Sequence, residues 1–96
     1  PKGVKSLKFK WTEQDPMLTW KAPKGKKWGD VVNKFVIYQF KDGEKINLDD
    51  ASHILKITTY TSFKVPYVKD GKSTFVVTAL DRVGNESKGA KKAVTL

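Results

Sequence analysis

Apolar and polar side chains alternate along most of this 96-residue chain. Near its start, Leu7, Phe9 and Trp11 alternate with Lys8 and Lys10. This period of two is typical of a strand with one buried face and one solvated face. We therefore expect the first strand here, with the two aromatic rings and Leu7 directed toward a core.

The following residues predict a turn and a second strand. Thr12 to Pro16 is typical of a turn. In Met17–Trp20, the side chains of Leu18 and Trp20 share one face, and Pro23 ends the strand because proline has no N–H for a sheet ladder. Trp20 is expected in the core.

Two longer apolar runs predict the central strands. Residues 34–41 are rich in β-branched and aromatic side chains and end at the turn signal Asp42-Gly43. Residues 74–81 form the second run. Both runs are apolar on both faces, so we expect both strands to lie in the middle of a sheet.

Shorter elements complete the pattern. Asn47 to Ser52 predicts one helical turn capped by Asn47, with Asp49 and Asp50 placing negative charge near its start. The remaining strands are predicted at residues 54–58, 62–65 and 90–96. About seven short strands with turn signals between them, and no amphipathic helix, predict an all-β antiparallel sandwich that forms one domain over residues 1–96.

Three segments carry a likeness to a known family. Leu18–Pro23 contains a core Trp before a proline, Phe35–Tyr38 is an apolar strand, and Thr74–Ser87 ends in Asp81-x-x-Gly84-Asn85-Glu86-Ser87. Together they resemble the second, third and sixth strands of the fibronectin type III domain, in the version appended to bacterial carbohydrate-active enzymes. With residues 41–52, the chain is similar to the C-terminal module of glycosyl-hydrolase-like lipoproteins from gut bacteria.

The resemblance implies a seven-stranded, immunoglobulin-like β-sandwich without catalytic residues or cofactors. It implies an accessory or spacer module that docks on or positions a glycoside-hydrolase-like catalytic domain in the same chain, outside the cytoplasm. Pro1 is not an initiator Met, and no signal peptide follows it. We therefore expect a monomeric module excised from a larger protein.

One position departs from the family pattern. The family usually has a Tyr at the start of the sixth strand, whose hydroxyl ties the preceding corner to the backbone. Alignment through Ala79 places Ser73 there. We expect the corner to be looser, or Tyr67 to pack nearby and partly replace the missing ring. The chain also lacks the Arg-Gly-Asp of adhesive relatives, so no adhesion role carries over.

The net charge of +9 raises the question of a polyanionic partner. Eighteen of the 19 basic residues are Lys, and only Arg82 supplies a guanidinium group. The lysines run along the whole chain, which favours solvated strand faces over a polyanion site and speaks against nucleic acid. No apolar run is long enough to cross a bilayer, so no membrane insertion is expected.

Candidate chemistry is sparse. His53 is the only imidazole, and the chain has no Cys, so we expect no metal site, no cofactor and a structural His53. Asp49 and Asp50 are adjacent on a short turn, where capping is a better account than paired catalysis. Asp81 is expected to bond backbone N–H groups of its hairpin, and Gly84 to supply a permissive dihedral.

Carbohydrate binding is the main alternative function. Aromatic rings stack on sugars, and the chain has three Trp residues. Trp20 is expected in the core, and Trp11 in the core or at its rim. Trp28, in the Lys/Gly-rich segment after Pro23, is then the one ring expected to be an exposed platform, which together with nearby lysines would give weak binding.

The central strands suggest an interface. If their other faces form the core, five apolar side chains face outward, namely Val36, Tyr38, Phe40, Val76 and Leu80. Lysine stems and loops of the same chain are one candidate cover for this patch. The second candidate, which we adopt as the hypothesis, is that the neighbouring catalytic domain docks there.

Overall fold

The computed structural model describes residues 1–24 and 32–96. Within them, seven strands form two antiparallel sheets, as the alternation predicts. The strands are β1 (Lys5–Thr12), β2 (Asp15–Lys21), β3 (Val32–Lys41), β4 (Ile54–Thr58), β5 (Ser62–Lys64), β6 (Lys72–Asp81) and β7 (Ala90–Thr95).

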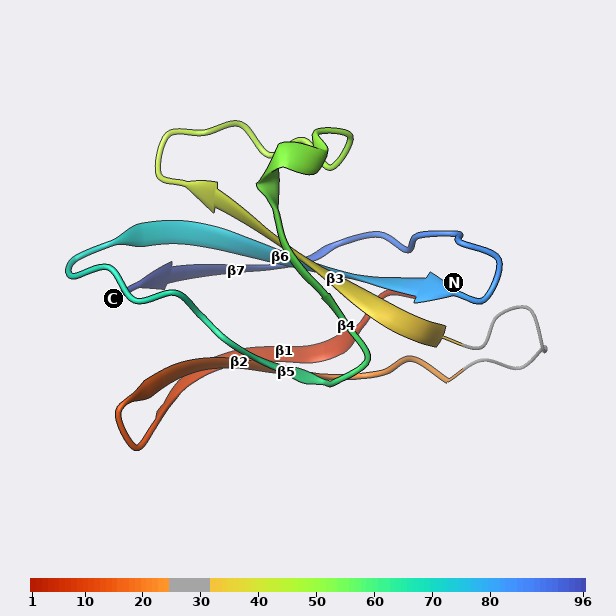
Figure 1. Cartoon of the computed structure of the whole chain (residues 1–96), viewed down its shortest axis with the longest axis horizontal. Coiled ribbons are helices and arrows are strands. Elements are labelled where there is room, and N and C mark those ends of the chain that lie inside the picture. Colours follow the sequence, from red (N-terminus) through yellow and green to blue (C-terminus); the bar gives the residue numbers. More distant parts are fainter. Residues whose placement is uncertain (25–31) are drawn as a thin grey trace.

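The two sheets divide the strands unequally. One sheet has the order β1-β2-β5, and the other has the order β4-β3-β6-β7 (Figure 1). The β3–β6 pair is the longest, running from Val32 opposite Asp81 to Lys41 opposite Ser73. These two strands form the centre of the larger sheet, as their apolar composition predicts.

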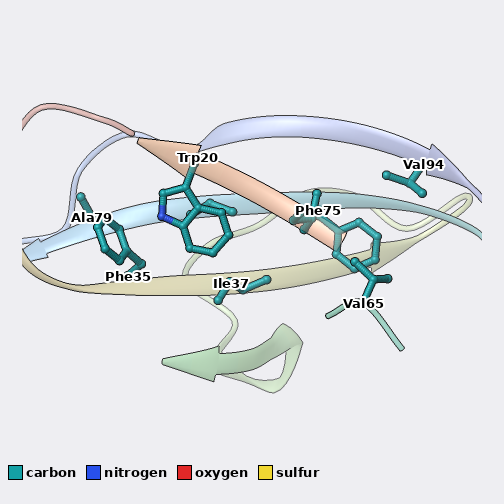
Figure 2. Close-up of a cluster of buried hydrophobic side chains, with 9 residues drawn as sticks. Trp20, Phe35, Ile37, Val65, Phe75, Ala79 and Val94 are labelled. Atoms are coloured by element: carbon teal, nitrogen blue, oxygen red, sulfur yellow. The ribbon is translucent and has the colours of Figure 1, made fainter. Parts of the chain in front are cut away.

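The inner faces of the sheets enclose the main core. Figure 2 shows Trp20 of β2 packed among side chains of the opposite sheet. Its ring meets the ring of Phe35 edge to face, with centroids 5.7 Å apart. The buried members of this core are Leu18, Trp20, Phe35, Ile37, Val65, Phe75, Val77, Ala79 and Val94.

The first turn is shorter than the sequence suggests. Thr12 pairs with Asp15, so only Glu13 and Gln14 connect β1 to β2, and Glu13 adopts a φ of +56°. Pro16 lies inside β2 instead of the turn. Its carbonyl accepts a hydrogen bond from the N–H of Val65 at 2.9 Å, because proline lacks only the donor half of a ladder position.

The helical turn lies later than predicted. A 3₁₀ turn, η2, spans Ala51–His53 and is capped by Asp50, whose Oδ1 accepts from the N–H of Ser52 at 3.0 Å. Asn47 instead accepts from the N–H of Asp49 at 3.1 Å and forms a separate local turn. The prediction of Asn47 as the N-cap is wrong, because the N–H of Asp50 closes a single turn onto the carbonyl of Asn47 at 3.3 Å and the 3₁₀ turn begins only after Asp50.

Candidate functional site

The five side chains predicted to meet a neighbouring domain do share one side of β3 and β6. Val36, Tyr38, Phe40 and Val76 form a second buried cluster on the outer face of the larger sheet, and Leu80 packs at its side. We call these five residues the outer cluster. The exposures of the first four are only 3%, 2%, 1% and 0%. The prediction that this patch is open to another domain is therefore wrong.

The chain itself covers the outer cluster. The segment between β3 and β4, residues 42–53, crosses the face of the larger sheet that lies away from β1-β2-β5 (Figure 1). We call it the covering segment. It places Ile46 and Leu48 on the outer cluster, and Ile54 follows at the start of β4. Apolar side chains on both faces of β3 and β6 are thus buried within one domain.

His53 closes one end of the cover. Its ring stacks on Phe40 with centroids 4.5 Å apart, and its Nδ1 lies 3.0 Å from the carbonyl oxygen of Gln39. Nε2 lies 3.5 Å from Asp50 and 3.8 Å from Glu44. The half-buried imidazole therefore packs as part of the structure. The described residues contain no group of three or more metal-ligating side chains.

A second part of the chain, at Gly89, also passes over the outer cluster. A Cβ built on Gly89 would lie 2.3 Å from Cγ1 of Val76 and 3.5 Å from Cδ1 of Leu48. Real Cβ atoms do not approach other heavy atoms so closely. The chain before β7 can pass over the outer cluster only because this position lacks a side chain.

Glu86 accepts hydrogen bonds from two hydroxyl groups, one from Tyr38 of the outer cluster and one from Thr78. The hydroxyls of Tyr38 and Thr78 both donate to Oε2 of Glu86, each at 2.5 Å. Burial and then the adjacent Glu86 carboxylate raise the pKa of the Tyr38 phenol well above its ordinary value. The tyrosine hydroxyl is thereby held as a neutral donor in a largely apolar setting.

The rest of the hairpin motif also bonds within the domain. Oδ1 of Asp81 accepts from the N–H groups of Val83 and Asn85 at 3.0 and 2.9 Å, as predicted. Burial acts to raise the pKa of Asp81, but these bonds and the amide of Asn85 outweigh it and lower the pKa. Gly84 has a φ of +86°, and Oγ of Ser87 accepts from the N–H of Ala79 at 2.8 Å. The motif therefore builds a tight hairpin.

Two aromatic rings lie open at one end of the smaller sheet. Trp11 is 49% exposed and Tyr67 is 59% exposed, and their ring centroids are 6.1 Å apart. Trp11 thus lies at the rim, in agreement with the core-or-rim prediction. Its side chain is on the same side of β1 as Leu7 and Phe9 but lies beyond the end of the core. Tyr67 packs on Trp11. Trp28, the predicted platform, lies outside the described residues.

The corner at Ser73 contains a hollow. A cavity of about 310 Å³ opens there, with walls that include Pro66, Val68, Val94 and Leu96. Oγ of Ser73 accepts from Nε2 of Gln39 at 3.0 Å. Tyr67 points its ring at Trp11, so it does not replace the tyrosine that the resemblance leads one to expect at this corner.

Comparison with family models and with curated proteins gives no match. No protein-family model matches the sequence, and no curated protein matches it. Within residues 1–24 and 32–96, no helix has the length and hydrophobicity of a membrane span. The assignment of a function therefore depends on the residues and their arrangement.

Proposed function

We propose that this chain is a fibronectin type III-like accessory module without catalytic chemistry of its own. In the parent protein it docks on or positions a glycoside-hydrolase-like catalytic domain outside the cytoplasm. Two features support the family assignment. The third and sixth strands are neighbours, as the resemblance requires, and the Asp81–Ser87 motif forms the hairpin after the sixth strand.

The observation that carries the proposed role is the placement of the chain ends. The domain measures 43 × 30 × 16 Å, and its two ends lie toward opposite ends of the long axis (Figure 1). A sandwich with a core between its sheets and a second cluster outside one of them is a rigid body. Such a body holds whatever adjoins its two ends apart, which suits a spacer.

The outer cluster takes no part in this role. Its side chains are occupied by the covering segment, so a neighbouring domain must meet the module through other residues. The polar groups of the motif support a role without chemistry, because their hydrogen bonds go to the domain itself.

The test is to sequence the coding region on both sides of the codons for residues 1–96 and then to delete these codons. We expect a catalytic domain for polysaccharide in the same reading frame. Removing the module should lower the thermal stability or the polysaccharide turnover of that protein. A start codon directly before Pro1 with a stop codon after Leu96 would contradict the accessory role.

A second function is favoured by one observation, the exposed pair of Trp11 and Tyr67. The exposed ring of Trp11 is available to stack on a sugar, with the ring of Tyr67 inclined to it by 66°, and this pair supports weak carbohydrate binding. Titration of the Trp fluorescence with neutral polysaccharides tests this function. Tyr67→Ala, which keeps Trp11 as the reporter, should weaken the response, whereas Tyr60→Ala, which removes an exposed ring elsewhere, should leave it intact.

A further inference from the structure

The outer face of the β1-β2-β5 sheet gathers lysines that are scattered in the sequence. Directly opposed residues share a face of a sheet. The cross-strand rows on this face are Lys5 with Lys21, Lys8 with Thr19 and Ser62, and Lys10 with Met17 and Lys64. We call this surface the lysine face, and its charged members are Lys5, Lys8, Lys10, Lys21 and Lys64.

A bulge in β1 completes the lysine face. Lys5 and Lys8 are three residues apart, whereas their partners Lys21 and Thr19 are two apart, so β1 contains one extra residue here. In a regular strand, residues three apart point to opposite faces. Ser6 adopts a φ of +56° at the bulge, and both lysines then point outward.

Most of the positive charges on this face have no acidic partner among the described residues. Lys64 pairs with Asp15 at 3.1 Å, and it is the one lysine of the face with an ion pair to a described residue. Lys5 lies directly opposite Lys21. Like charges at such positions repel each other and destabilise the pairing. An anionic ligand would remove this repulsion.

Polar groups lie between the ammonium groups. A hollow of about 310 Å³ on this face is lined by Ser6, Lys8, Lys10, Thr19, Trp20 and Lys21. The side chain of Trp20 is buried on the other side of the sheet, so the described residues in the cross-strand rows offer cations and hydroxyl groups without an aromatic ring. β1 and β5 are the two edge strands of this three-stranded sheet.

We infer that the lysine face binds an acidic polysaccharide, whose carboxylate or sulfate groups lie along the rows of lysines. Lysines supply point charges, and the hydroxyls of Ser6, Thr19 and Ser62 suit sugar hydroxyls. Single-stranded nucleic acid is a poorer fit, because its binding surfaces add aromatic rings on which bases stack.

This inference does not rest on the proposed accessory role, since it concerns only side chains within the domain. The test measures binding of the 96-residue chain to polygalacturonate at several NaCl concentrations by affinity electrophoresis or calorimetry. The triple variant K8S/K10S/K21S should bind about tenfold or more weakly at low salt, and its log K should fall less steeply with log salt because fewer counterions are released on binding. The charge-preserving variant K8R/K10R/K21R should retain binding.

A matched variant separates the lysine face from the overall charge. K45S/K69S/K88S removes three exposed lysines elsewhere, and it should change affinity by less than about threefold. Equal losses in both triple variants would overturn the inference. Equal binding of fully methyl-esterified polygalacturonate would overturn it too, because that polymer lacks the charges. Tighter binding of oligothymidylate, with the same sensitivity to K8S/K10S/K21S, would assign the face to nucleic acid instead.

Discussion

The outer face of β4-β3-β6-β7 is apolar and lies under its own chain, whereas the outer face of β1-β2-β5 is charged and open. On the first face, the covering segment and Gly89 exclude solvent from four nearly inaccessible side chains. On the second face, the lysines have almost no acidic partners among the described residues. The difference teaches that a sheet apolar on both sides does not by itself mark an interface.

The largest expected effect is on the covered face. Phe40→Ala should lower the free energy of unfolding by about 3–5 kcal/mol, because it removes a buried ring and leaves a cavity. Lys10→Ala, on the open face, should change it by less than about 0.5 kcal/mol. Urea unfolding followed by circular dichroism measures both. A loss below about 1 kcal/mol for Phe40→Ala would mean that the covering segment is not packed in solution.

Gly89 gives a second way to break the cover. Gly89→Ala should cost about 1–3 kcal/mol, because its Cβ would overlap Cγ1 of Val76. Val76→Ala removes the overlapping atom, so the double variant should be more stable than the two single losses predict. Strict additivity in this double-mutant cycle, measured by urea unfolding, would contradict the close approach.

The hydrogen bond between Tyr38 and Glu86 should contribute less to the free energy of unfolding, and its contribution should depend on pH. Tyr38→Phe should cost about 0.5–1.5 kcal/mol at pH 7, since it removes a hydrogen bond to the carboxylate of the exposed Glu86. The pKa of Tyr38 is raised in the folded state above its ordinary value of 10.0, so the folded state keeps a proton that the unfolded state releases. This stability is fully present below pH 10.0 and is lost as the pH rises further.

Urea midpoints between neutral and strongly alkaline pH test this prediction. The difference between the wild type and Tyr38→Phe should shrink above pH 10.0, whereas Tyr60→Phe, at an exposed position, should follow the wild type. A constant difference across that range would show that the phenol of Tyr38 titrates alike in both states.

The smallest expected effect is on the open face. Lys21→Glu should raise the free energy of unfolding by about 0.2–1 kcal/mol, because it turns the like-charge pair with Lys5 into an opposite-charge pair. High salt should reduce the gain by screening. Lys45→Glu, in the exposed turn region, is the matched control and should show no such gain. A loss of stability in Lys21→Glu would mean that the two ammonium groups are not close in solution.

The strands were predictable because their side chains alternate in a chain with few competing patterns. The faces of β3 and β6 were assigned correctly, and so was the excess of apolar residues outside the core. Loops of the same chain were one candidate cover, but the segment itself was not identified, because Ile46 and Leu48 are only two apolar residues in a polar connection. No period marks such a segment, and its position depends on the β3–β4 pairing that it connects.

The lysine face was missed for a different reason. Along the chain its lysines are dispersed, and dispersal was taken as evidence against a binding surface. The pairing of β1, β2 and β5 brings them together, and the bulge at Ser6 sets the direction of Lys5. A serine gives no sequence signal for a left-handed backbone. The hairpin motif was easier, since Asp, Gly and Asn each have a known role in turns.

The covering segment also has a consequence for the order of folding. It can pack only on a surface that exists after β3 has paired with β6, and that pairing joins residues some 40 positions apart in the sequence. The contacts of Ile46, Leu48 and His53 should therefore form after the rate-limiting step. Substitutions in this segment would then hasten unfolding and leave the refolding rate almost unchanged, so the cover acts chiefly on the lifetime of the native state.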